Sequence, residues 1–150
     1  MLRDPYPVTY RWVGVDHVSP QLLAAVIAHE DPAFLLREGG TDWHRLLKRA
    51  LAFHSDGHHP GASTTLSQQL AKNLFLWSKK EPVRKLVLEP VLAEQLRREL
   101  GRRRVLEMYV NYAEFGQGMW GICAASWAYY HKPPAQLTLA DSAWIHRCHS

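Results

Sequence analysis

The spacing of apolar and polar residues along the chain is helical over most of its length. It predicts roughly seven helices and no convincing pair of strands. A short strand is expected only at residues 9–15, within an extended lead-in interrupted by Pro5, Pro7 and Gly14. The fold class that follows is all-α, in a single domain spanning residues 1–150.

The first helix should begin with Ser19 as its cap and Pro20 in its first turn, and should end at Glu30, before Asp31 and Pro32. Two adjacent carboxylates at a helix C-terminus oppose the helix dipole, so the pair asks for an explanation. Solvated loop acids are the commoner explanation, and a functional carboxylate is the other. The apolar face of this helix consists of Leu22, Leu23, Val26 and Ile27.

A basic amphipathic helix is expected over residues 43–53, capped by Thr41 or Asp42. Such a helix either packs its apolar side into the core or lies on an anionic membrane surface. In the following linker the histidines match no metal-binding pattern and are interpreted as loop residues. The apolar side consists of Trp43, Leu46, Leu47, Ala50 and Leu51, the basic side of Arg45, Lys48 and Arg49, and the linker histidines are His54, His58 and His59.

Residues 61–77 are the most informative segment of the sequence. A turn of small residues leads to Thr64 and Thr65, which can cap the next helix, as at helix starts that hold a phosphate. Polar residues on one face of this helix either meet solvent or line a site. That face consists of Thr65, Gln69, Lys72 and Asn73, while Leu66, Leu70, Leu74 and Phe75 point elsewhere.

The next helix is expected to begin at Glu81 and Pro82 and to end at Gly101. Pro90 should bend it just after Glu89, because proline removes one backbone hydrogen bond. Arg84 and Lys85 precede Glu89 closely enough for their charges to interact.

Three further helices are expected over residues 102–116, 122–131 and 139–148, the last capped by Thr138. A glycine-rich turn separates the first two. Its glycines are Gly116, Gly118 and Gly121.

The composition indicates a globular chain with an anionic partner. It has 150 residues, 47% of them apolar, a net charge of +4 and nine histidines. That charge suits a nucleic acid, a phosphorylated ligand or an acidic membrane alike. Cys123 and Cys148 can form a disulfide or remain free thiols. No apolar run approaches the roughly 20 residues that cross a bilayer, so we expect a soluble chain or the soluble piece of an anchored one.

Taken together, residues 8–147 resemble the peptidoglycan glycosyltransferases of family 51, which occur as monofunctional enzymes and as domains of bifunctional penicillin-binding proteins. Five motifs in order carry the resemblance. They are Glu30, Asp31, Phe34 and Gly39; Ser63 to Leu70 with Lys72 and Asn73; Arg84, Lys85 and Glu89; Arg103 to Asn111; and residues 116–132. The sequence departs from the family pattern at several positions. Arg37 replaces a histidine, one extra residue precedes Asp42, Ala62 and Ser63 replace a glycine pair, and Gln117 stands in the fifth motif. In the third motif Glu89 lies five residues after Arg84, not four, so that Lys85 takes an arginine position.

The resemblance implies a lysozyme-like helical domain with a small membrane-proximal jaw, and it implies that this chain is truncated before the family's last helices. The implied activity is the polymerisation of lipid II into glycan strands at the outer face of the bacterial cytoplasmic membrane. The implied partners are lipid II, the growing strand, an anionic membrane surface and other cell-wall synthesis proteins, with no nucleic acid. The resemblance implies no definite cofactor. It leaves open whether a divalent cation, Mg²⁺ or Mn²⁺, binds at the pyrophosphate.

The resemblance also assigns roles to individual residues. Glu30 is the implied general base and Glu89 the assisting acid, because a sugar hydroxyl must lose a proton as it attacks. The implied substrate-binding residues are Asp31, Phe34, Thr65, Gln69, Lys72, Asn73, Arg84 and Lys85. Three alternatives remain: a weakly active relative that only binds lipid II or its partners, a lytic enzyme that cleaves glycan, and a nucleic-acid-binding protein.

Overall fold

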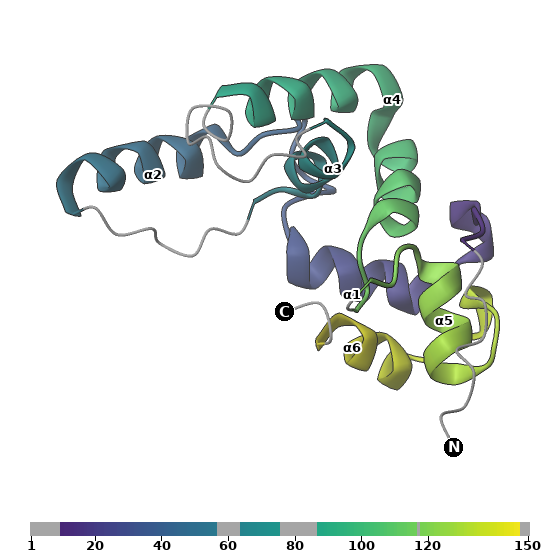
Figure 1. Ribbon diagram of the computed structural model, residues 1–150. Coiled ribbons are helices and arrows are strands. Elements are labelled where there is room, and N and C mark those ends of the chain that lie inside the picture. Colours follow the sequence, from purple (N-terminus) through teal and green to yellow (C-terminus); the bar gives the residue numbers. More distant parts are fainter. Residues whose placement is uncertain (1–9, 57–63, 76–86, 117, 148–150) are drawn as a thin grey trace.

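The computed structural model describes residues 10–56, 64–75, 87–116 and 118–147 (Figure 1). Within these ranges the chain is helical, and the only β pairing is one isolated bridge between Glu114 and Trp120. The predicted all-α class is confirmed. The helices are α1 (Pro20–Glu30), α2 (Trp43–Asp56), α3 (Leu66–Phe75), α4 (Glu89–Tyr112), α5 (Ile122–Tyr130) and α6 (Leu139–Arg147), with short 3-10 helices η1 (Val15–His17) and η3 (Pro134–Gln136).

The hydrophobic core lies where α1, α3, the second half of α4, α5 and α6 meet. In Figure 1, α3 packs against α4, and α1 packs against α6. Leu22 and Val26 on the predicted apolar face of α1 are buried, and Leu23 and Ile27 pack partly against the same core. Burying side chains of this size contributes about 1.5–3 kcal/mol each. The other fully buried aliphatic side chains include Leu66, Leu70, Val105, Val110, Ile122 and Ile145.

The predicted strand at residues 9–15 is wrong over its described part, because the backbone there pairs with side chains. The Val13 N–H donates to Asn111 Oδ1 at 2.9 Å, and Asn111 Nδ2 donates to the Val13 carbonyl oxygen at 2.8 Å. The Val15 N–H donates to the Glu107 carboxylate at 3.0 Å. Two polar side chains of α4 therefore satisfy this segment, which needs no partner strand.

Helix α4 bends at Gly101, where the sequence predicted that one helix ends and the next begins, and Figure 1 shows its two arms at a steep angle. Gly101 adopts φ 71° and ψ 174°, a conformation that only glycine reaches without strain. The bend predicted after Glu89 stays a prediction, because most of the helix expected before Pro90 is not described. Pro90 lies in the first turn of α4, and Val87 and Leu88 before it are π-helical. The predicted start at residues 81–82 lies outside the described residues.

The remaining helix ends largely follow the sequence. The second arm of α4 stops at Tyr112, four residues before the predicted Gly116. The Asp141 N–H donates to Thr138 Oγ1 at 3.3 Å, which confirms the predicted cap of α6. Cys123 is a buried thiol whose pKa is raised by burial, and it forms no disulfide within the described residues; Cys148 lies outside them.

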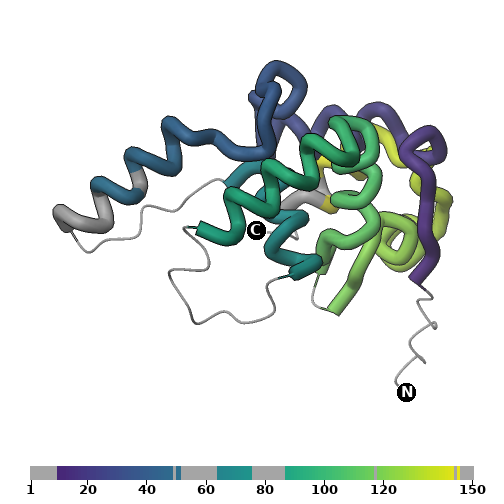
Figure 2. Tube along the Cα trace, turned by 90° about the horizontal axis from the view of Figure 1, so that it is seen from above, coloured from purple at the N-terminus to yellow at the C-terminus, as the bar shows by residue number. Residues whose placement is uncertain are grey.

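Helix α2 projects from the body of the molecule, as Figures 1 and 2 both show. Asp42 caps it by accepting a hydrogen bond from the Arg45 N–H at 3.0 Å. Trp43, Leu47 and Leu51, spaced four residues apart, are 56%, 60% and 63% exposed among the described residues. The core-helix interpretation of this segment is therefore wrong for these three side chains. No helix in the described ranges is long and apolar enough to cross a membrane.

Candidate active site

Glu30 is the last residue of α1, and its carboxylate is held by a side chain from α3. The Gln69 Nε2 donates to Glu30 Oε2 at 2.8 Å and to the Thr64 carbonyl oxygen at 3.3 Å. Glu30 remains partly exposed. A carboxylate that is fixed in orientation and still accessible has the geometry of a general base.

A tyrosine from α4 completes this arrangement. The Tyr109 hydroxyl donates to Gln69 Oε1 at 3.1 Å, so both ends of the Gln69 amide are engaged by protein groups. Burial raises the pKa of Tyr109 strongly, and the negative charge of Glu30 adds to this effect. The hydroxyl therefore keeps its proton throughout the ordinary pH range.

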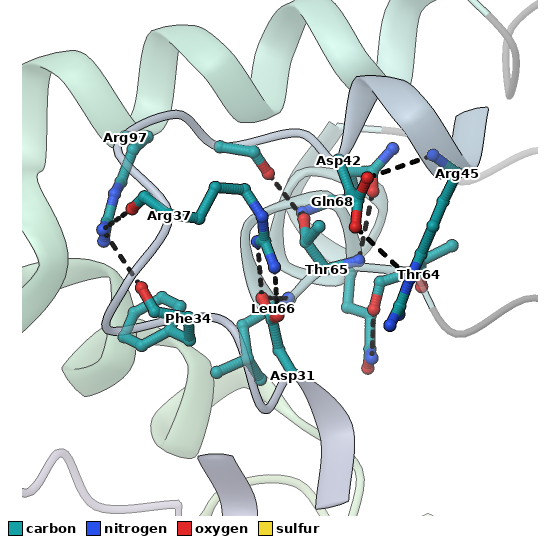
Figure 3. A network of polar contacts seen from close by, with 12 residues as sticks. Asp31, Phe34, Arg37, Asp42, Arg45, Thr64, Thr65, Leu66, Gln68 and Arg97 are labelled. Carbon is teal, nitrogen blue, oxygen red and sulfur yellow. Dashed lines mark hydrogen bonds and ion pairs between the residues drawn. The ribbon is translucent and has the colours of Figure 1, made fainter. Parts of the chain in front are cut away.

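Asp31, the second carboxylate of the pair, is buried and structural. Its two oxygens accept from both terminal nitrogens of Arg37, and Oδ2 also accepts from the Leu66 N–H at 3.2 Å (Figure 3). The hydrogen bond to Asp31 raises the pKa of Arg37. Asp31 thus joins the end of α1 to the start of α3 and is 2% exposed. Its implied part in substrate binding stays a prediction.

The start of α3 is satisfied by protein groups, which corrects the expectation of a phosphate-holding helix start. The Gln68 N–H donates to Thr65 Oγ1, and the Thr65 N–H donates to Gln68 Oε1, each at 3.1 Å. This reciprocal pair is a capping box. With the Leu66 N–H bound to Asp31, these three donors are already committed. The predicted role of Thr65 as a cap is confirmed.

Arg97 of α4 holds the loop that carries Phe34. Its guanidinium donates to the backbone oxygens of Phe34, Arg37 and Glu38 at 3.1–3.3 Å and lies 4.8 Å from the centre of the Phe34 ring. Burial lowers the pKa of Arg97, and the nearby positive charges of Arg102 and Arg37 lower it further. Phe34 is buried as well, and its ring packs beneath the loop against the Arg97 guanidinium.

The first turn of α4 is tied to the same loop. Thr41 Oγ1 donates to the Pro90 carbonyl oxygen at 3.0 Å, and Thr65 Oγ1 donates to the Gly40 carbonyl oxygen at 2.6 Å. A Cβ at Gly40 would lie 2.0 Å from the Ala93 carbonyl oxygen, so only glycine fits there. Glu89, buried in this first turn, directly precedes Pro90, whose carbonyl oxygen accepts the hydrogen bond from Thr41.

The other predicted site residues divide into two groups. Lys72 and Asn73 lie on α3 one turn beyond Gln69, where Lys72 is exposed and Asn73 partly buried. Arg84 and Lys85 lie outside the described residues, as do the loop histidines His58 and His59. The structure therefore brings Glu30 and Gln69 into contact, with Lys72 and Asn73 following on the same helix.

Three residues of this region were missed by sequence reasoning. Tyr109 lies within the fourth motif, among apolar residues that are buried in the structure. These apolar neighbours were the one feature of the sequence that could have indicated a buried tyrosine. Arg97 sits in a polar run that was not singled out in the sequence, and Arg37 was noted only as a departure from the pattern. In the described ranges no group of three or more histidine, cysteine or acidic side chains could hold a metal ion.

Comparison with known proteins gives a consistent result. Residues 3–149 match the model of the Transglycosylase family. The biosynthetic peptidoglycan transglycosylase of Shewanella denitrificans is 41% identical over 143 residues, which cover 95% of this chain and 61% of that protein. The proteins of the same name from Mannheimia succiniciproducens and Klebsiella oxytoca are 39% and 44% identical, over 93% and 89% of this chain and 56% and 54% of theirs. The chain thus spans little more than half the length of these relatives. It belongs to the transglycosylase family.

Proposed function

We propose that this chain carries the glycosyl-transfer site of a peptidoglycan glycosyltransferase that polymerises lipid II into glycan strands. In this reaction the acceptor 4-hydroxyl oxygen attacks the anomeric carbon of the donor sugar with inversion. The bond from that carbon to the phosphate oxygen breaks, and polyprenyl pyrophosphate leaves. Family membership and the names of the relatives support the proposal.

The observation that carries the proposal is the placement of Glu30. Its carboxylate is partly exposed, sits at a helix end and is oriented by Gln69 from a segment 39 residues away. We assign Glu30 as the base that takes the proton of the acceptor hydroxyl. A positioned base of this kind typically contributes 10²- to 10⁴-fold in rate, by the order of magnitude known for general acid–base catalysis.

The leaving pyrophosphate needs positive charge, which we assign to Lys72, Arg84 and Lys85. Lys72 is exposed on α3 one turn beyond Gln69. Glu89, buried at the start of α4, is assigned as the acid that assists by orienting these groups or the donor. Fixed charges act here chiefly through preorganisation.

We assign the contact with an anionic membrane surface to helix α2. This helix would correspond to the membrane-proximal jaw that the resemblance implies. Its exposed side chains Trp43, Leu47 and Leu51 line one face, and Arg45 and Lys48 are exposed as well. A helix with this division of charge and apolar area lies in the plane of an interface. The periplasmic side of the cytoplasmic membrane is where lipid II polymerisation would place it.

The test is the polymerisation of labelled lipid II by the purified chain, with products separated by length. Glu30→Gln should reduce the rate by about 10²-fold or more, as the loss of a general base does. Glu99→Gln, a change at an exposed acid on α4, is the matched control and should leave the rate unchanged. Binding of lipid II without product would show instead a relative that only binds. Clearing of isolated cell walls would show a lytic enzyme, and equal rates for both variants would overturn the assignment of Glu30.

A further inference from the structure

The amide of Gln69 links two groups that lie on different helices. Its Nε2 donates to Glu30 at the end of α1, and its Oε1 accepts from the Tyr109 hydroxyl on α4, at 2.8 and 3.1 Å. Nε2 also donates to the Thr64 carbonyl oxygen. Both amide hydrogens are therefore used within the protein, and Gln69 has no N–H left for a substrate.

The orientation of this amide is determined at both ends. An ionised carboxylate can only accept hydrogen bonds, so the NH₂ group of Gln69 must face Glu30. The oxygen of Gln69 then faces Tyr109, which must donate. Tyr109 can always donate this hydrogen bond, because burial keeps its hydroxyl protonated. Its ring is packed into the core and is 2% exposed, so the hydroxyl stays in place.

We propose that Tyr109 is a positioning residue for the reaction, which acts through Gln69 to hold the Glu30 carboxylate in the orientation of a base. Tyr109 does not touch the substrate in this proposal. The inference rests on the proposed function in that it takes Glu30 as the base. Its structural part, the control of the Glu30 carboxylate by a buried hydroxyl two hydrogen bonds away, can be tested without activity.

The first test is a ¹³C NMR titration of the Glu30 side-chain carboxyl in the whole chain, with its signal assigned by Glu30→Gln. Tyr109→Phe keeps the ring and removes the hydroxyl, which frees the Gln69 amide to turn. A donor that stabilises the ionised carboxylate lowers its pKa, so weakening that donor should raise the pKa of Glu30 measurably above that of the wild type. Tyr112→Phe is the control, because Tyr112 lies on the same helix at the surface, and it should change nothing.

A double-mutant cycle tests whether the effect passes through Gln69. Gln69→Met has a similar length and no hydrogen-bonding amide, and it should raise the pKa of Glu30 at least as much as Tyr109→Phe does. In the Gln69→Met background, Tyr109→Phe should have no further effect. If the two changes add, or if Tyr109→Phe leaves the titration of Glu30 unchanged, the proposal is overturned.

The kinetic test uses polymerisation of lipid II. Tyr109→Phe should lower kcat about fivefold, with KM nearly constant, as expected for the loss of one neutral hydrogen bond that orients the base. The acid limb of its pH–rate profile should move to higher pH, which a merely structural loss would not cause. An inactive wild-type chain would refute the proposed function, and the NMR titration would still decide the role of Tyr109.

Discussion

Asp31→Asn should destabilise the fold more than any exchange of a surface carboxylate. Asp31 is 2% exposed and accepts from both terminal nitrogens of Arg37 and from the Leu66 N–H. Asparagine can still accept at its oxygen, but its NH₂ group would face the Arg37 guanidinium. The positive charge of Arg37, whose side chain is only 15% exposed, would then lack its counter-charge.

The structure sets the size of this effect. Removing one partner of a buried ion pair costs about 3–5 kcal/mol, and the partial exposure of Arg37 places the expected loss near the lower end, at about 3 kcal/mol. For a domain of this length that corresponds to a fall in Tm of roughly 6–12 °C. Arg37→Gln should cost a comparable amount, since it leaves the Asp31 carboxylate buried without its cation.

Urea unfolding followed by far-ultraviolet circular dichroism measures the loss directly, as a lower midpoint at an unchanged slope. Asp16→Asn is the matched control, because Asp16 also pairs with an arginine, Arg103, but both side chains are more than half exposed. Surface pairs contribute little, so this midpoint should hardly move. Equal midpoint shifts for Asp31→Asn and Asp16→Asn would refute the assignment of Asp31 as a buried anchor.

Two further predictions follow from other parts of the fold. The hydrogen bond from Lys132, with those from Thr138, lowers the pKa of Asp141 from 3.8 to about 2, so this carboxylate stabilises the folded state above pH 3.8. The Tm difference between wild type and Asp141→Asn should therefore be constant from pH 7 to about 5 and should vanish as the pH falls through about 2; a difference that persists at pH 2 contradicts this. The double variant Leu47→Gln and Leu51→Gln should bind phosphatidylglycerol vesicles at least about tenfold more weakly in a sedimentation assay, given the apolar area lost, whereas Leu139→Gln, at an exposed leucine of α6, should bind as wild type does.

The sequence predicted those features that depend on local chemistry. The cap at Asp42, the capping role of Thr65 and the break at Gly101 follow from residues whose backbone preferences act over one turn. The strand at residues 9–15 failed for the opposite reason. The partners that satisfy its backbone, Asn111 and Glu107, lie more than ninety residues away on α4, and a single sequence does not show such pairings.

The candidate site shows the same limit. Glu30 was found from its position at a helix end and from a motif, but its contact with Gln69 joins segments 39 residues apart. The phosphate-holding start of α3 was the wrong interpretation because Asp31 supplies the anion that a helix N-terminus favours. Arg97 carried no signal at all, since a buried arginine and a solvated one have the same appearance in a polar run.

The structure explains why two acids stand side by side where the helix dipole disfavours them. Asp31 is neutralised by Arg37 and serves the fold, so the pair contributes only one available carboxylate. Glu30 is held by the amide of Gln69, which is neutral. The same dipeptide thus divides its work. Asp31, paired with Arg37, is buried and joins the end of α1 to the start of α3, whereas Glu30 is partly exposed and is oriented by the Gln69 amide.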